Sequence, residues 1–320
     1  MNTCTPLYRN LAVLLATCAI LVMACSRIDE TIAPSNDHGS FHSKMLEKVK
    51  SDYSPQPRKS VSTNAIQFFD IFEVFDDVAD WISDAADVAM ADIKGFPEGA
   101  AAGGTVGAIL EAGGAVGATA TGAVVGGIIS AAGASAKAYK NLNDSTGTGG
   151  IIVRRPTVSP YGSTTMPNSI DSIGWLHNEA VIYMLTNMQT GNASDFQSLA
   201  RNWGKNVRGY HQVIVDSVTH LNNFTPLINN ASAGGLFNAY GQQLRDNGLT
   251  TEGDYIDSLA SEIVYLHNNQ YSFAAVLSLI AAYRDEAANL GISTTRRTLI
   301  QRQLTIMLYS IALWDANGGV

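Results

Sequence analysis

The chain is short of cysteine and of charge. Its 320 residues include only three cysteines, Cys4, Cys18 and Cys25, so residues 26–320 contain no thiol. Disulfide bonds, cysteine-rich metal sites and a cysteine nucleophile are therefore excluded from residues 26–320. Only 15% of all residues are charged, against about a quarter in typical domains. The formal net charge of −8 gives the protein no electrostatic reason to bind nucleic acid.

Recognisable catalytic motifs are also lacking. No G-x-S-x-G sequence occurs, and no serine, histidine and aspartate set can be assembled from the sequence. The run from Gly103 to Gly107 lacks the preceding strand and the following lysine of a phosphate-binding loop. No histidine pair has the spacing of a zinc-binding helix, and each histidine is expected to be a cap or surface residue. We therefore expect no enzymatic activity, cofactor or metal, and an enzyme alternative would depend on His177 and Glu179.

The first 25 residues have the pattern of a secretory signal. Arg9 supplies a positive charge, Leu11–Ala24 is an apolar run too short to span a bilayer comfortably, and the small Ala24 precedes Cys25. The junction Val22-Met23-Ala24-Cys25 resembles that of bacterial lipoproteins, in which the cysteine thiol is acylated and the preceding peptide is removed. This resemblance implies a signal peptide over residues 1–24, lipidation of Cys25 and membrane lipid as a partner. The alternative is an ordinary cleaved signal or a single anchoring helix.

The residues after Cys25 bear on location and on the tether. Ser26 stands where aspartate retains many lipoproteins in the inner membrane, so the resemblance implies the cell envelope and anchoring in the outer membrane, in either leaflet. Residues 25–64 are rich in serine, proline and charge and have no sustained apolar period. This composition predicts a flexible tether.

An acidic amphipathic helix is expected at the start of the next segment, residues 65–140. Acidic residues recur at spacings of three and four from Asp70 to Asp87, and Phe68, Phe72 and Phe75 lie on the opposite face. The pattern predicts a helix over residues 66–93. Its acidic face would be repelled by an anionic bilayer, so the helix either packs on a neighbouring helix or shields a partner.

A segment rich in glycine and alanine follows, and residues 99–136 carry a single charge, Glu111. Glycines stand four apart in three rows: Gly99, Gly103 and Gly107; Gly113 and Gly117; Gly122 and Gly126. On a helix such rows form stripes without side chains that let another helix approach closely. In water each helical glycine costs about 0.8–1 kcal/mol relative to alanine, so close packing or a bilayer must compensate. We expect a helical hairpin of residues 99–110 and 112–136 with Glu111 at its tip.

This stretch resembles the glycine-zipper segments of bacteriocin-like peptides and of small bacterial envelope proteins. The resemblance implies membrane insertion or self-association. Residues 112–136 are uncharged and long enough to cross a bilayer, although glycine and alanine make them only weakly hydrophobic. The alternative is a hairpin buried in the helical core of the protein itself.

The rest of the chain is expected to be a linker, residues 141–168, and a helical domain, residues 169–320. Apolar residues recur at helical spacing in the domain, first from Ile173 to Met184, then from Phe196 to Val213, and then over about 225–245, 252–267, 271–290 and 294–315. Ser194, Thr251 and Ser293 are predicted N-caps. The string Ile173–Glu179 resembles the start of a domain found in bacterial lipoproteins of unknown function. Short Asn/Gly loops indicate a bundle of five to six helices.

The expected architecture is all-α: an amphipathic helix and a Gly/Ala-rich helical hairpin, followed by a helical bundle. The expected function is that of a non-enzymatic, lipid-anchored envelope lipoprotein whose glycine-zipper segment mediates membrane insertion or helix association, with a bacteriocin-like action as one form. Self-association or a protein partner is compatible with this function. The alternative is a soluble helical binding module with the Gly/Ala hairpin buried in its own core.

Overall fold

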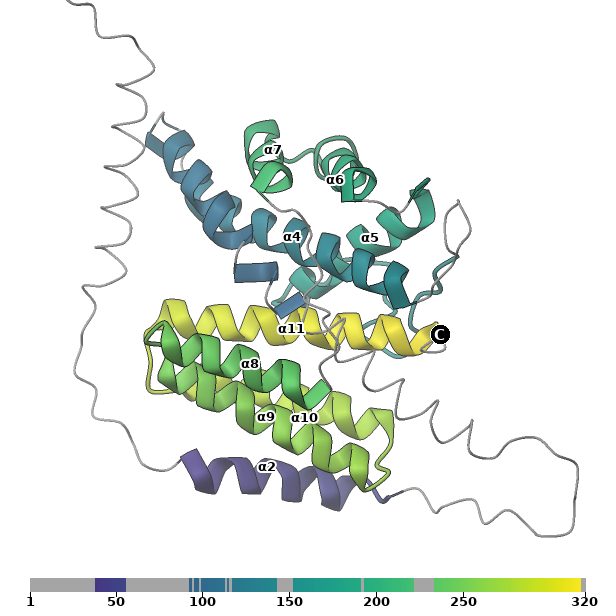
Figure 1. The fold of residues 1–320 in the computed structure, drawn as a ribbon, viewed down its shortest axis with the longest axis vertical. Coiled ribbons are helices and arrows are strands. Elements are labelled where there is room, and N and C mark those ends of the chain that lie inside the picture. The colour runs from purple at the N-terminus through teal and green to yellow at the C-terminus, as the bar shows by residue number, and fades with distance from the viewer. Residues whose placement is uncertain are drawn as a thin grey trace, which may run out of the picture. The chain divides into compact units, whose positions relative to one another are not determined.

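The all-α prediction is confirmed over the residues that the structure describes. The computed structural model describes residues 38–55, 92–93, 95–97, 99–112, 114, 117–142, 152–190, 193–221 and 233–317. They belong to one compact unit, Asp37–Val320, and every regular element among them is a helix (Figure 1). The predicted signal peptide, Cys25 and all but the end of the predicted acidic helix lie outside the described residues.

The regular elements of the described residues are nine labelled α-helices, two short helices of other types and the helical residues 92–93, 95–97 and 99–112. Residues 99–112 are helical and form, with the helix that follows, a pair that we name the glycine hairpin. The labelled helices are α2 (His38–Asp52), α4 (Ala118–Leu142), α5 (Asp171–Asn187), α6 (Ala193–Asn202), α7 (Gln212–Leu221), α8 (Ala233–Asp246), α9 (Thr250–Asn268), α10 (Phe273–Glu286) and α11 (Thr294–Ala316). A π-helix, η1 (Trp203–Val207), and a 3-10 helix, η2 (Ala287–Asn289), complete the set.

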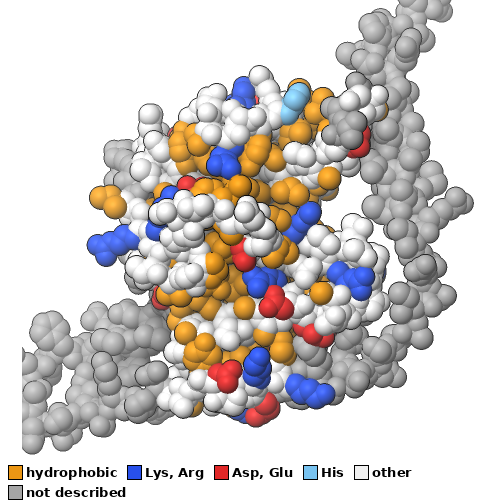
Figure 2. Space-filling view, turned by 180° about the vertical axis from the view of Figure 1, so that it is seen from behind, with side chains coloured by type: hydrophobic (Ala, Val, Ile, Leu, Met, Phe, Trp, Pro, Cys, Tyr) orange, Lys and Arg blue, Asp and Glu red, His pale blue; other side chains and the backbone are white. Residues whose placement is uncertain are grey.

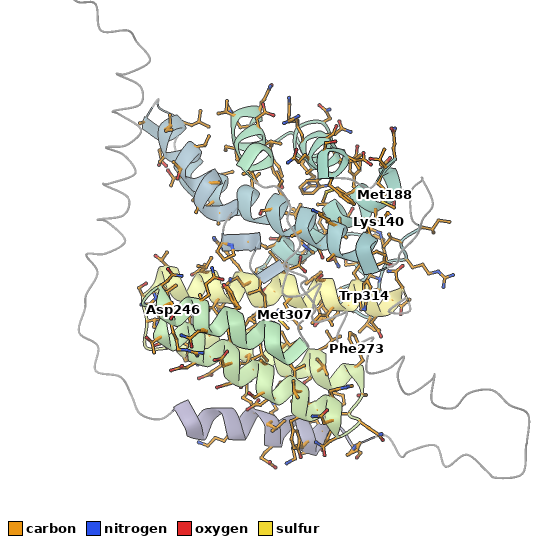
Figure 3. All side chains as sticks on the ribbon, viewed as in Figure 1. Lys140, Met188, Asp246, Phe273, Met307 and Trp314 are labelled. Carbon is orange, nitrogen blue, oxygen red and sulfur yellow. The ribbon has the colours of Figure 1, made fainter. Side chains whose placement is uncertain are left out.

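Helix α11 is the centre of the unit, and each residue from Gln303 to Trp314 is buried. On one side Ile306, Tyr309 and Leu313 join a core formed with the glycine hairpin, α5, α6 and α7, which we name the hairpin core. On another side Leu304, Met307 and Leu308 join a core formed with α2, α8, α9 and α10, which we name the α8–α10 core. Figure 3 labels Trp314 and Met307, one from each core. A helix that is apolar all round is typical of such a shared position.

Both cores contain aromatic and small residues, and the hairpin core differs in the run of small residues that α4 contributes. The hairpin core takes small residues from α4, among them Ala131, Ala132 and Ala136, and fills the remaining space with Trp203 and Met184. The α8–α10 core contains a pair of tyrosines, Tyr255 and Tyr283, whose ring centroids lie 5.0 Å apart. Aromatic residues bury large side-chain areas in both cores, and the small residues of α4 let neighbouring helices approach it closely.

The structure differs from the expected tether, because α2 lies within residues 25–64. Its residue Val49 is buried, and Met45 and Leu46 pack against the α8–α10 core. These three residues occupy one face of the helix, and the sequence of α2 also contains Phe41, four positions before Met45. The spacing of four at Phe41, Met45 and Val49 is a short helical period within a polar segment, and the helix contacts α9 and α10.

The predicted second helix of the bundle is also interrupted. The chain from Phe196 to Val213 forms α6, η1 and α7, with a break at Gly209, whose φ is +68°. Glycine adopts this left-handed conformation without steric cost, so it ends the helix. The described part of residues 169–320 therefore contains seven α-helices rather than five to six.

Helix starts agree with the sequence only in part. Ser293 caps α11, where its hydroxyl oxygen accepts a hydrogen bond from the backbone nitrogen of Arg296. Helix α9 begins two residues earlier than expected, and its N-cap position is Leu249 rather than Thr251. Helix α6 begins at Ala193, before the predicted cap Ser194. Residues 152–168, in the predicted linker, contain no helix or strand.

Candidate functional site

The glycine hairpin brings two glycine rows into backbone contact. A methyl group added at Gly103 would lie 2.0 Å from the carbonyl oxygen of Gly122. At Gly99 it would lie 2.1 Å from the carbonyl oxygen of Gly126, and at Gly107 it would lie 2.2 Å from that of Ala118. Real side-chain carbons do not approach an oxygen this closely, so only glycine fits at these positions. The two helices therefore pack backbone against backbone, as glycine stripes permit.

The contact is reciprocal, which identifies the pairing of the rows. Added methyl groups at Gly122 and Gly126 would lie 2.2 Å and 2.1 Å from the carbonyl oxygens of Gly103 and Gly99. Neighbours along one row thus meet neighbours along the other in antiparallel order. Such close approach allows Cα–H groups to contact carbonyl oxygens across the two helices. Five of the seven predicted glycines are brought together in this contact: Gly99, Gly103, Gly107, Gly122 and Gly126.

Of the other two predicted glycines, the structure describes Gly117, which does not belong to this contact. Gly117 lies in the turn before α4 with a φ of +77°, and nothing lies within 4 Å of the position its side chain would take. Gly113 lies outside the described residues. Gly117 is therefore not part of a packing stripe. At Gly117 the residue type serves the turn, because left-handed φ values strain residues with a side chain.

Glu111 lies at the tip of the hairpin and caps the start of α4. Its carboxylate oxygens accept hydrogen bonds from the backbone nitrogens of Thr119, at 3.1 Å, and Gly117, at 3.3 Å. Hydrogen bonds from Thr119 and Gly117 lower the pKa of Glu111 below its ordinary value. The first N–H groups of a helix lack partners and carry partial positive charge, which a carboxylate satisfies. The single charge of residues 99–136 thus stabilises the turn.

The hairpin is buried at one end and exposed at the other. Val125, Ile128 and Ile129 of α4 are buried in the hairpin core, whereas Ile109 near the tip is 52% exposed. Ala118–Lys140 is the candidate membrane span among the described residues, with a mean hydropathy of 1.3, and 61% of its most apolar stretch is buried. A core helix of a bundle meets the same criterion of length and composition. Figure 2 shows hydrophobic side chains on one face of the unit, with charged side chains between them.

A buried polar network holds the residues that lead into the hairpin. His177 of α5 and Asp92 are both fully buried, and the Nε2 atom of His177 lies 2.9 Å from Oδ1 of Asp92. The Nδ1 atom of His177 lies 3.1 Å from Oδ1 of Asn178, whose Nδ2 donates to the carbonyl of Tyr309 at 2.8 Å. Both ring nitrogens of His177 thus lie within hydrogen-bond distance of a side-chain oxygen, which fixes the orientation of the ring.

A second buried contact holds the next residue. The Nε2 atom of Gln303, in α11, donates to the carbonyl oxygen of Ile93 at 2.9 Å and to the hydroxyl of Tyr240 at 2.8 Å. The Ile93 side chain is itself buried in the α8–α10 core. Asp92 and Ile93 therefore fasten the start of the hairpin to both cores, because a buried polar group left without its partner costs free energy.

His177 and Glu179, on which the alternative of an enzyme depends, both contact other side chains of the protein. His177 was expected to be a cap or surface residue, but it is buried against Asp92. Glu179 forms an ion pair with Arg155. Within the described ranges, no group of three or more histidine, aspartate or glutamate side chains could hold a metal ion. The other carboxylate oxygen of Asp92 is buried without a hydrogen-bond partner.

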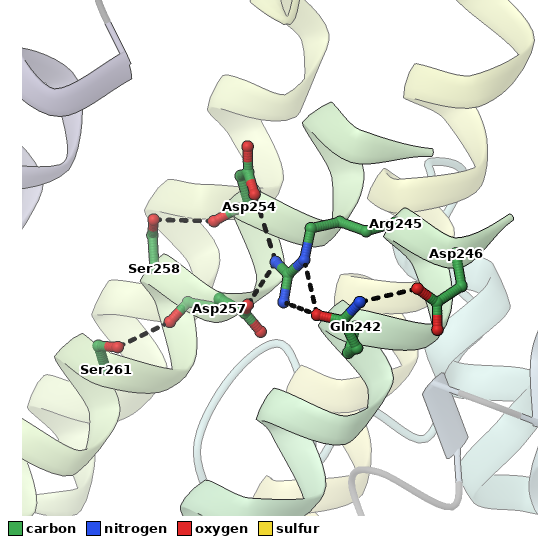
Figure 4. Close-up of polar contacts among 7 residues, drawn as sticks. All are labelled: Gln242, Arg245, Asp246, Asp254, Asp257, Ser258 and Ser261. Carbon is green, nitrogen blue, oxygen red and sulfur yellow. Dashed lines mark hydrogen bonds and ion pairs between the residues drawn. The ribbon is translucent and has the colours of Figure 1, made fainter. Parts of the chain in front are cut away.

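Helices α8 and α9 form a second close pair, with charged groups across it (Figure 4). The guanidinium of Arg245 lies 2.5 Å from a carboxylate oxygen of Asp257 and 3.2 Å from one of Asp254. A methyl group added at Gly241 would lie 1.9 Å from the other oxygen of Asp257. The hydrogen bond that Arg245 donates to Asp257 is the main cause of the raised pKa of Arg245.

One buried carboxyl group lies between α9 and α10. Burial raises the pKa of Glu262 to about 7, and a hydrogen bond from Tyr283 opposes this shift. Burial is also the main cause of the raised pKa values of Tyr283 and Tyr255. The hydroxyl of Tyr255 donates to the carbonyl oxygen of Tyr283. Glu262 therefore changes its charge near neutral pH inside the α8–α10 core.

Comparison with known proteins gives no relative. No protein-family model, no curated protein and no solved structure matches this chain. The arrangement of the described residues is therefore the basis on which a function can be inferred. Sequence reasoning missed Asp92, because its importance comes from a contact with a residue 85 positions away.

Proposed function

We propose that this protein is a non-enzymatic helical module of the cell envelope, lipid-anchored at Cys25, in which the glycine zipper serves helix association within the chain. The observation that carries this proposal is the backbone contact of Gly99, Gly103 and Gly107 with α4. Glycine stripes that already meet each other have no free face for a helix of another molecule. Burial of the second half of α4 in the hairpin core supports the same role.

The surroundings of the candidate catalytic residues favour a non-enzymatic role over catalysis. The imidazole of His177 is enclosed by Asp92 and Asn178, so a substrate has no access to it. Glu179 is engaged by Arg155. Neither side chain is placed to act as a general base on a bound molecule, because a base must reach the proton that it removes.

Membrane insertion of the hairpin is the second candidate function, and one observation favours it. Helix α4 is long and apolar enough to cross a bilayer, and the only charge of residues 99–136 lies at the hairpin tip. Insertion would require the second half of α4 to leave α5, α6 and α7, which it contacts in the folded unit. Exposure of that apolar surface to water would cost free energy, so a bilayer would have to replace every contact.

Two measurements on the full chain test the proposal. Radiolabelled palmitate should be incorporated into the wild-type protein and not into Cys25→Ala, and equal labelling of both would refute the anchor. Vesicles loaded with a fluorescent dye should keep the dye when the folded protein is added. Dye release by the wild-type protein would instead support insertion of the hairpin.

A further inference from the structure

One arginine, directly after the π-helix η1, lies against a tryptophan of α5. The central carbon of the Arg208 guanidinium is 5.7 Å from the centre of the Trp175 ring, a distance that allows a cation–π contact. The indole nitrogen of Trp175 donates to the carbonyl oxygen of Ser163 at 2.9 Å, which holds the ring in place. The backbone nitrogen of Arg208 donates to the carbonyl oxygen of Trp203, five residues earlier, at 2.9 Å. Such π-helical turns are rare and often lie at functional sites.

The guanidinium of Arg208 has no carboxylate partner among the residues that the structure describes. Its Nη2 atom lies 3.8 Å from the sulfur of Met166, a weak acceptor, and its Nε atom is buried without a hydrogen-bond partner. The two aspartates of residues 193–221 are engaged elsewhere, because Asp216 pairs with another arginine and Asp195 accepts from two backbone nitrogens. A guanidinium that is held in place with unused donors suits a carboxylate, which it can bind through two parallel hydrogen bonds.

Exposed apolar side chains and a second cation accompany Arg208. Met166, which contacts Arg208, is 41% exposed, and Val207 is 53% exposed. Lys205, in η1, is partly exposed and has no ion pair within the described ranges. We name Met166, Trp175, Lys205, Val207 and Arg208 the Arg208 surface. Tryptophan, methionine and arginine are enriched where proteins bind one another.

The charge of this part of the chain is opposite to that of the whole chain. Residues 152–168 and 193–221 contain five lysine or arginine residues and two aspartates, whereas the chain has a net charge of −8. A short peptide bound at Arg208 would meet mainly this local positive charge, because salt screens charges beyond about 8 Å. A bilayer is flat and wide, so it would also meet acidic side chains beyond this region. Charge complementarity therefore favours an acidic peptide over an anionic membrane.

We propose that the Arg208 surface binds an acidic segment of a partner protein, with a carboxylate on the guanidinium of Arg208 and a neighbouring apolar side chain on Met166. The guanidinium already lies against Trp175, so little of its conformational freedom is lost on binding. The flexible side chain of Met166 can adapt to apolar groups of different shape. The inference goes beyond the proposed function and does not depend on lipidation of Cys25.

A peptide array probed with the purified full chain tests the proposal, and an antibody detects the bound protein. Each short peptide carries one aspartate or glutamate at a set spacing from one leucine or phenylalanine, and its matched peptide carries asparagine or glutamine in place of the acid. We expect about tenfold tighter binding to the acidic member of the best pairs, because a hydrogen bond to a charged group is lost in the amide. Equal binding to both members of every pair would overturn the proposal.

Three variants assign this preference to the Arg208 surface. Arg208→Gln should abolish it, and Arg208→Lys should remove most of it, because an ammonium cannot form two parallel hydrogen bonds to one carboxylate. Arg208→Lys keeps the charge, so it tests the contact even where Arg208→Gln fails to fold. Arg297→Gln makes the same change of net charge on α11 and should keep the preference. A full preference in either Arg208 variant would overturn the proposal.

Two further probes identify the other possible occupants. Peptides covering residues 66–91 belong on the same array, and binding confined to them would mean that the chain itself supplies the acidic segment, which contradicts a partner protein. Phosphatidylglycerol vesicles are the second probe. Vesicle binding that Arg208→Gln weakens, together with no acidic preference on the array, would assign the Arg208 surface to a membrane and overturn the proposal.

Discussion

The glycine hairpin and the α8–α9 pair are two close helix contacts built on different chemistry. In the hairpin, Gly103 and Gly122 bring uncharged backbones together. In the α8–α9 pair, Gly241 leaves room for Asp257, which binds Arg245 across the contact. A backbone cannot move aside for an added atom, whereas a carboxylate can rotate. The hairpin should therefore tolerate substitutions at its glycines less well than the α8–α9 pair tolerates loss of its charges.

The largest effect is expected where the hairpin begins. His177→Ala removes a fully buried ring, which leaves a cavity, and deprives a buried oxygen of Asp92 of its hydrogen-bond partner, so together these losses should cost about 3–5 kcal/mol. Urea unfolding should show this loss in the free energy of unfolding. The control His267→Ala, at a half-buried position, should cost about 1 kcal/mol or less. The double variant Asp92→Ala/His177→Ala should lose less than the sum of the two single changes, and additivity would contradict a coupled pair.

The α8–α10 core should show the next largest effect, as a dependence on pH. The folded state keeps the proton on Glu262 up to a pKa of about 7, whereas the unfolded state releases it near the ordinary value of 4.5. The free energy of unfolding should therefore fall as pH rises from 4.5 to 7, by up to about 3 kcal/mol. Glu262→Gln carries no charge at any pH and should remove this slope. An unchanged slope in Glu262→Gln would show that another group is responsible.

The glycine contact itself is tested by two adjacent positions. Gly103→Ala introduces a methyl group 2.0 Å from a carbonyl oxygen, so the helices must separate, at a cost of about 2–3 kcal/mol. At Gly104 the nearest atom to an added methyl is 3.4 Å away, so Gly104→Ala should gain up to about 1 kcal/mol from helix propensity. Thermal unfolding should lower Tm for the first variant and raise it for the second. Equal shifts for both would contradict backbone contact.

The smallest effect is expected in the α8–α9 pair. Asp257→Asn weakens its ion pair with Arg245, in which both side chains are about a quarter exposed, and should cost about 1 kcal/mol. Asp254, at 63% exposure, is the control, and Asp254→Asn should change stability by about 0.5 kcal/mol or less. Added salt should reduce both losses, because it screens exposed charges. A cost for Asp257→Asn above that of Gly103→Ala would reverse the comparison.

The sequence predicted the local features of the hairpin but not its partner. The rows of glycine and the isolated Glu111 were sufficient to expect two helices with Glu111 at the tip, and Ser293 to expect the start of α11. A glycine stripe looks the same whether it faces lipid, another chain or its own hairpin. The pairing of Gly103 with Gly122 depends on how the chain turns back at Gly117, which a period of four does not contain.

Features that depend on distant contacts were missed. The burial of His177 requires Asp92, and α2 owes its docking to Val49 and two neighbouring apolar residues. The contact of His177 with Asp92 leaves no local pattern, and the spacing of four at Phe41, Met45 and Val49 is short and lies among polar residues. The break at Gly209 was missed because the apolar residues on each side of it keep a nearly continuous helical period. Periodicity reports the faces of helices, not the places where they end.

The most direct test of the account is a nuclear Overhauser measurement between the α-protons of Gly103 and those of Gly122 and Gly126. The protein should be folded, free of detergent and isotopically labelled at glycine. We expect cross-peaks within single molecules, which remain when labelled protein is diluted with unlabelled protein. Absence of these cross-peaks, or their appearance only between labelled and unlabelled molecules, would contradict the claim that the glycine rows pair within the chain.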